Sequence, residues 1–105
     1  MRAYIYVINE SNSDYYKVGF SKNAPDARVK ELQTGNPRTL RLIRYVMIED
    51  AYRVEQLLHA VLGKWHARNE WFCIPQSDVD HAMGMFDKVI KKKENVNARI
   101  EARQT

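Results

Sequence analysis

Two short runs of β-branched and aromatic residues, separated by a turn-forming segment, constrain this chain most. Residues 3–8 (AYIYVI) and residues 15–20 (YYKVGF) flank residues 11–14 (SNSD). Val, Ile and Tyr favour strands, whereas Ser, Asn and Asp favour turns. The beginning of the sequence is therefore predicted to form an antiparallel β-hairpin.

Helical and strand-like segments alternate after this hairpin. A helix is expected near residues 25–34, a third strand over residues 40–48, and a longer helix over residues 50–65, where apolar positions recur at helical spacing. Residues 71–74 are expected to form a short buried strand or an extended segment, and a last helix is expected from about residue 78. The order predicts an α+β fold, a small three- to four-stranded, mostly antiparallel sheet flanked by helices.

Composition limits the class of protein. The 105 residues are 45% hydrophobic and 29% charged, which is typical of one globular domain. No apolar run approaches the about 20 residues of a transmembrane helix, and the first residues do not resemble a signal peptide. Cys73 is the only cysteine, which excludes an internal disulfide and a Cys-rich zinc module. We therefore expect a cytoplasmic protein with no membrane contact.

The placement of charge is more informative than its total of +4. Residues 15–46 carry seven basic and two acidic groups, and residues 88–105 carry six basic and two acidic groups. Between them, residues 47–87 carry three basic and seven acidic groups. Basic blocks of this kind suit a polyanion, usually nucleic acid, although an ordinary solvated surface gives the same totals. Lys91-Lys92-Lys93 is open to the same two interpretations, a phosphate contact or a solvated helix end.

One face of the predicted hairpin collects an unusual set of side chains. Alternation along the strands puts Tyr4, Tyr6, Tyr15 and Lys17 on the same side as Gly19. A polar-aromatic surface held by cross-strand pairs is the simpler explanation, and a functional site is the alternative. The opposite side is expected to be core, with Ile5, Val7, Tyr16, Val18 and Phe20.

Several short motifs occur in the order and spacing of a known family. YIY at residues 4–6, KVG at residues 17–19, then Arg28 and Glu55 resemble the GIY-YIG nuclease superfamily. The resemblance covers about residues 3–74 and is closest to the small phage-type branch described as DNA-binding domains. It implies a nuclease domain over residues 1–75, with residues 76–105 as a helix and basic tail that packs on it or extends from it. The branch is matched further by residues 32–37 (LQTGNP), 58–59 (LH) and 69–72 (NEWF).

The resemblance also implies roles for individual residues. Tyr6 matches the proposed general base or water-orienting group, and Lys17 stands where the second motif usually has a tyrosine. Arg28 matches the arginine that contacts the scissile phosphate, and Glu55 matches the carboxylate that binds Mg²⁺ or Mn²⁺. Gly19 matches the motif glycine, where a side chain would crowd the site. Contacts to DNA are expected from Tyr4, Lys22, Lys30, Arg38 and His59, with Arg41 and Arg44 as further phosphate contacts in a protein that only binds.

The chemistry of phosphodiester hydrolysis is consistent with these residue types. Negative charge builds on the phosphate and the leaving oxygen, and a metal ion held by a carboxylate neutralises it. An arginine binds phosphate oxygens in a bidentate way. A neutral phenol is a poor base, but nearby cations favour its phenolate, so Lys17 is a candidate for a functional substitute of the missing tyrosine.

Taken singly, these residues have simpler explanations. Glu55 and Arg28 can pair with neighbouring charges, and a lone histidine such as His59 is more often a packing residue than a ligand. The sequence therefore leaves three functions open: a metal-dependent DNA endonuclease, a catalytically weak or inactive DNA-binding module on the same fold, and a protein-interaction domain. One active site cuts one strand, so a homodimer is one route to double-strand cleavage.

Overall fold

The β1–β2 hairpin is the centre of a five-stranded antiparallel sheet. A computed structural model describes the backbone of residues 2–104 and the side chains of residues 2–97. The strand order is β3-β1-β2-β5-β4, with β1 at Arg2–Glu10, β2 at Tyr15–Ser21, β3 at Leu40–Glu49, β4 at His66–Arg68 and β5 at Trp71–Cys73. The predicted α+β class is confirmed, and the sheet has five strands where three or four were expected. The additional strand, β4, has only three residues, all of them exposed, so no apolar pattern marks it.

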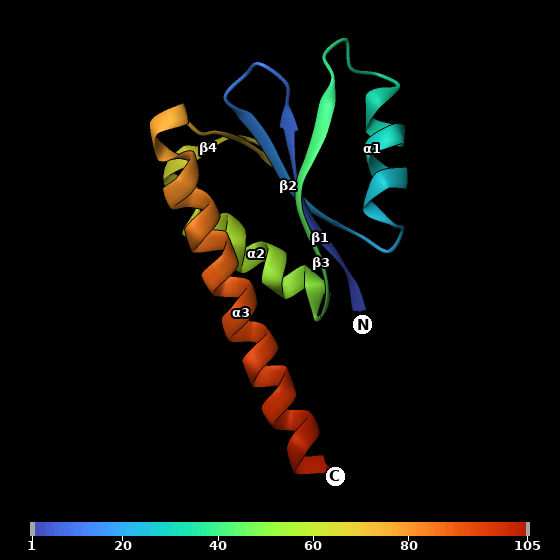
Figure 1. The fold of residues 1–105 in the computed structure, drawn as a ribbon, viewed down its shortest axis with the longest axis vertical. Helices are drawn as coiled ribbons and strands as arrows, with labels where there is room; N and C mark the ends of the chain where they lie inside the picture. Colours follow the sequence, from blue (N-terminus) through green and yellow to red (C-terminus); the bar gives the residue numbers. More distant parts are fainter. Residues whose placement is uncertain (1, 105) are drawn as a thin grey trace.

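Helices cover both faces of this sheet (Figure 1). The helix α1, Pro25–Gln33, lies on one face, while α2, Ala51–Val61, and α3, Val79–Gln104, lie on the other. Short 3₁₀ turns at Gly63–Trp65 and Gln76–Asp78 precede β4 and α3. The predicted helix over residues 50–65 therefore ends earlier, at Val61.

Because β1 lies inside the sheet and is covered on both faces, its side chains are buried in both directions. Ile5 and Val7 belong to the main core, which α2 and α3 complete, as the sequence predicts. Tyr6 and Ile8 point to the other face and form a smaller core with Leu40 under α1. The tyrosine-rich face of the hairpin is therefore not an open surface around Tyr6, which is only 1% exposed.

The last helix has two parts that differ in their surroundings. Its beginning packs on α2 through Ala82, Met83, Phe86 and Ile90, which are all buried. Its second half projects away from the rest of the molecule (Figure 1). Among the helices of residues 2–104, none combines the length and the apolar character that a bilayer span requires.

We expect adjacent leucines of α2 to differ sharply in their effect on stability. Leu58 is fully buried and Leu57 is 51% exposed. Leu58→Ala should lower the free energy of unfolding by about 2–5 kcal/mol because it leaves a cavity in the core. Leu57→Ala, the matched control, should change it by no more than about 0.5 kcal/mol. Urea denaturation followed by circular dichroism measures both, and equal effects would contradict the orientation of α2.

Candidate functional site

The candidate site is centred on the cross-strand pair of Tyr6 and Gly19. Antiparallel pairing of β1 with β2 places these two residues directly opposite each other. A Cβ atom on Gly19 would lie 2.6 Å from Tyr6 Oη and 2.9 Å from Glu70 Oε2. The phenol hydroxyl and the Glu70 carboxylate therefore both lie over this glycine, in space that any other residue would fill.

Arg28 reaches the same place from α1. Its Nε donates a hydrogen bond to Tyr6 Oη at 3.5 Å, and its Nη1 donates one to Glu31 Oε2 at 3.0 Å. These two hydrogen bonds raise the pKa of the Arg28 guanidinium, so its positive charge is secure. About one third of the side chain is exposed, which leaves part of the guanidinium available to an anion.

Lys17 belongs to this group, but its charge is already engaged. Lys17 Nζ lies 2.9 Å from Glu70 Oε2 and 5.7 Å from the centroid of the Trp71 ring. The side chain is only 12% exposed, so the ion pair is partly shielded from water. Lys17, which the sequence predicts to act on Tyr6, is thus paired with Glu70, a residue to which the sequence alone assigns no role.

Glu70 is the residue of this site that sequence reasoning missed. It directly precedes β5, and its carbonyl accepts a hydrogen bond of 3.0 Å from the Val18 backbone N–H. This contact brings Glu70 beside β2, although 51 residues separate Glu70 from Gly19 in the sequence. The motif NEWF at residues 69–72 contains it, and that motif is the only sequence signal that could have drawn attention to it.

Glu55 and His59 approach from α2, on the other face of the sheet. β5 pairs with β2 only along Tyr15–Lys17, so the rest of that edge of β2 has no strand partner. His59 Nε2 lies 2.8 Å from the carbonyl oxygen of Val18 and therefore donates to it, which covers part of the open edge. Only Nδ1 of His59 remains for a contact with DNA.

The Glu55 carboxylate is buried without adequate partners. Glu55 is 7% exposed, and its Oε2 has no hydrogen-bond partner among the described residues. The nearest ion-pair contact, from His59 Nε2 to Oε1, is 3.9 Å long. Burial raises the pKa of Glu55, and the charge of Glu70 raises it further, whereas His59, the Phe20 backbone N–H and Lys17 lower it. A cation or a hydrogen-bond donor at Oε2 would relieve this cost.

The structure thus brings the predicted residues together in two groups. Tyr6, Lys17 and Arg28 gather around Gly19 on the α1 face, and Glu55 lies with His59 at the open edge of β2. Among the described residues, no hydrogen bond or ion pair joins Glu55 to Tyr6 or Arg28. Glu70 is the link, because it contacts the first group and acts electrostatically on Glu55.

The residues expected to contact DNA are spread over the surface. Tyr4 lines a shallow pocket between β3 and the start of α1, and Lys22 and Lys30 are exposed beside and on α1. Arg38 is exposed but pairs with Glu10 at 3.4 Å. Arg44 points to the other face of the sheet and pairs with Asp87 of α3 at 3.3 Å.

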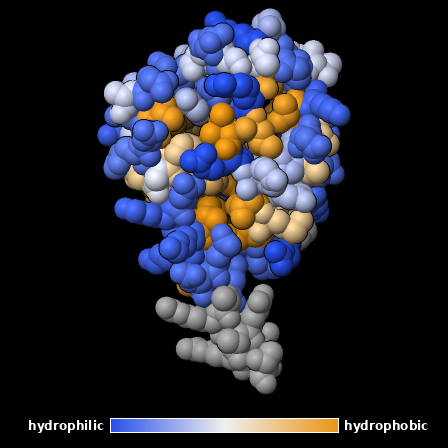
Figure 2. All heavy atoms as spheres, viewed as in Figure 1, coloured by the Kyte–Doolittle hydropathy of each residue, from blue (hydrophilic) through white to orange (hydrophobic). Residues whose placement is uncertain are grey.

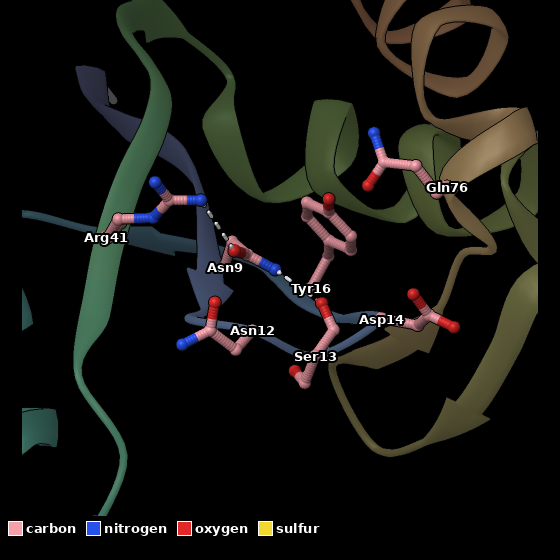
Figure 3. Close-up of a pocket in the computed structure, with 7 residues that line it drawn as sticks. All are labelled: Asn9, Asn12, Ser13, Asp14, Tyr16, Arg41 and Gln76. Carbon is pink, nitrogen blue, oxygen red and sulfur yellow. Dashed lines mark hydrogen bonds between the residues drawn. The ribbon is translucent and has the colours of Figure 1, made fainter.

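A separate polar cavity of about 230 Å³ lies at the turn of the hairpin (Figure 3). Asn9 is buried there and donates through Nδ2 to the carbonyl oxygens of Ser13 and Tyr15, at 3.2 and 3.0 Å. Arg41 Nη2 donates to Asn9 Oδ1 at 3.3 Å. Arg41 is therefore held at the turn and is not part of the group around Gly19.

The donor set fits a hydrated hard cation better than a fully ligated metal. The described residues contain no group of three or more His, Cys, Asp or Glu side chains able to hold a metal ion. Mg²⁺ keeps several of its waters and is commonly bound through one or two carboxylates. The unpartnered, buried Oε2 of Glu55 fits this mode of binding.

We expect removal of the Glu55 charge to stabilise the fold in a pH-dependent way. A folded-state pKa above the unfolded value means that ionisation costs stability as pH rises through the folded pKa. Glu55→Gln should therefore resemble wild type below about pH 4 and be more stable by about 1 kcal/mol at neutral pH. Denaturation at both pH values measures this, with the exposed Glu94→Gln as the control. A gain that does not depend on pH would contradict the assignment.

Gly19 should be the least tolerant glycine of the chain. Gly19→Ala forces the buried Tyr6 ring to move, so we expect a loss of about 1–3 kcal/mol in the free energy of unfolding. Gly84, in α3, has no atom within 4 Å of the added Cβ position, so Gly84→Ala should instead add about 0.5–1 kcal/mol. Thermal unfolding of both variants tests the contrast, which fails if the two changes have the same sign.

Comparison with known proteins gives one match. A model of the T5orf172 domain family matches residues 3–87, from β1 into the packed beginning of α3, and so contains all the residues of the site. No curated protein and no solved structure gives a significant match. The family is nuclease-like and phage-associated, and a nuclease or a DNA-binding role is compatible with it. The chain belongs to the T5orf172 domain family.

Proposed function

We propose that the protein is a metal-dependent endonuclease of GIY-YIG type, which hydrolyses phosphodiester bonds of DNA. The observation that carries this proposal is the buried, unpartnered Oε2 of Glu55, linked through Glu70 to the cations around Gly19. Buried polar groups without partners are rare in folded proteins and need an explanation. A metal ion bound at Oε2 would provide such an explanation.

Arg28 is the group suited to bind the scissile phosphate. Its guanidinium is partly exposed, and Nε and Nη1 already have acceptors in Tyr6 and Glu31, which fix its position. The remaining N–H groups offer charge-assisted hydrogen bonds to phosphate oxygens. A planar, pre-positioned guanidinium loses little freedom when it binds an anion.

Tyr6 is suited to orient the attacking water or to take its proton. Its hydroxyl accepts a hydrogen bond from Arg28, and Lys17 lies in the same cluster, paired with the Glu70 carboxylate. In this proposal Lys17 replaces the second tyrosine of the GIY-YIG motif.

Glu55 is the residue that would hold Mg²⁺ or Mn²⁺. Such an ion, when bound, neutralises charge on the phosphate and the leaving oxygen. Glu55 itself contributes a carboxylate whose place is fixed by burial on α2 and by the neighbouring His59. His59 in turn is fixed by its bond to the carbonyl of Val18.

A catalytically weak or inactive DNA-binding module on the same fold is the second candidate. Glu70 favours it, because its carboxylate neutralises Lys17 and lies over Gly19, where it would repel a phosphate. The burial of Tyr6 favours it too, since substrate contact then requires the surrounding side chains to move.

Nicking of supercoiled plasmid DNA with Mg²⁺ or Mn²⁺ separates the two candidates. We expect metal-dependent nicking by the wild type and a loss of about 100-fold or more in Glu55→Gln, which removes the metal-binding charge but not the fold. The exposed Asp80→Asn, which removes an acidic charge outside the site, is the control and should retain activity. Activity in Glu55→Gln equal to wild type would rule out the proposed role of Glu55.

Two further results bear on the proposal. Lys17→Met should lower the rate and shift its pH profile, and unchanged kinetics would remove Lys17 from the mechanism. Salt-sensitive DNA binding without nicking would establish the second candidate, because counterion release makes such binding fall steeply with salt. Absence of both activities would favour a protein-interaction domain.

A further inference from the structure

The second half of α3 contributes no buried side chain to the core over its described part. Among the side chains that the structure describes, Ile90 is the last buried one of α3, and none of residues 91–97 is buried. The family match ends at residue 87, so this half lies beyond the conserved domain that the match defines. A polar helical segment without buried side chains adds little to stability, which is compatible with a role outside folding.

Three lysines of this region face solvent without partners. Lys88, Lys91 and Lys92 are exposed and line a shallow groove with Asn95 and Val96; we refer to these three residues as the lysine stripe. Among the described residues, none of the three has an ion pair. In the space-filling view, hydrophilic residues dominate the surface where α3 leaves the body (Figure 2).

Two of the three nearby acids are engaged elsewhere, and the third, the exposed Glu94, offsets only one of the three lysine charges. Asp50 pairs with Lys93 at 3.8 Å, and Asp87 pairs with Arg44 at 3.3 Å. These two pairs hold α3 against the start of α2 and against β3. With Glu94 counted, the lysine stripe therefore retains a net positive charge on the side of the helix that points to solvent.

We propose that the lysine stripe binds the phosphate backbone of DNA, as a second contact outside the candidate site. The inference rests on the DNA interaction of the proposed function. The helical rise of about 1.5 Å per residue puts Lys88 and Lys92 about 6 Å apart along α3, on the same face of the helix. The Asn95 amide extends the row with a neutral donor, a common partner of phosphate oxygens.

The composition of the helix favours DNA over a lipid surface. Helices that lie on membranes need a continuous apolar face beside the basic one. Over residues 91–97, Val96 is the only apolar side chain, and it is 40% exposed. Charge without an apolar face suits a ligand that is recognised by its charge, as a phosphate backbone is.

The salt dependence of DNA binding tests this proposal. Fluorescence anisotropy with a labelled duplex, in EDTA to prevent cleavage, gives the affinity across about 50–200 mM salt. The variant Lys88→Gln/Lys91→Gln/Lys92→Gln should reduce the slope of log affinity against log salt by about 2–3 and weaken binding at least about 10-fold. Substitution of the same three residues by arginine should leave slope and affinity close to wild type.

Charge-matched and structural controls make the test specific. The variant Arg53→Gln/Lys64→Gln/Arg68→Gln removes three exposed cations from other elements and should change the slope by less than about 1. Circular dichroism should show unchanged helix content in every variant. Equal slopes for wild type and the lysine stripe variant would overturn the proposal, as would an equal loss in the control variant. Loss of binding to anionic phosphatidylserine vesicles, with DNA binding unchanged, would also overturn it.

The result is independent of the nuclease test. If the wild type does not nick plasmid DNA but binds it with a slope that depends on the lysine stripe, the inference stands and only catalysis fails. If the wild type nicks DNA and the slope is unchanged in the lysine stripe variant, the inference fails and the proposed nuclease stands.

Discussion

The close approach of Tyr6 to Gly19 is the constraint on which the candidate site depends. The ring of Tyr6 lies over a residue that has no Cβ, and this is why its hydroxyl reaches both Arg28 and the neighbourhood of Glu70. The approach exists because β1 is an interior strand, covered by α1 on the side to which Tyr6 points. The register of β1 against β2 therefore fixes the phenol over Gly19, where Arg28 from α1 and Glu70 from the segment before β5 approach it.

The site also contains a buried carboxylate whose ionisation is unfavourable. Glu55 is buried beside an acid, and its Oε2 has no partner among the described residues. Folded proteins keep such groups mainly where a function requires them. The two faces of the sheet contribute different groups: α1 carries the guanidinium of Arg28, and α2 carries the carboxylate of Glu55. Glu70, which precedes β5, contacts the first group and acts electrostatically on the second.

The basic residues of the two basic blocks differ in whether an acid pairs with them. The cations of the first basic block are largely paired, as Lys17 with Glu70, Arg38 with Glu10 and Arg44 with Asp87. The lysine stripe on α3 has no such partners among the described residues. If both proposals hold, the family domain supplies the chemistry, and the projecting helix supplies affinity for the nucleic acid backbone without reading its sequence.

The hairpin, the α+β class and the candidate residues could be predicted from the sequence alone. Local propensity and alternation are encoded over a few adjacent positions, and these features depend on them. The sequence also determined that Gly19 faces the same side as Lys17. The burial of Tyr6 and the ion pair between Lys17 and Glu70 are seen only in the folded structure. The same is true of the position of Glu55, on the helix that covers the opposite face of the sheet. These facts depend on contacts between residues far apart in the chain, and on β4 and β5, whose three-residue strands carry little periodic signal.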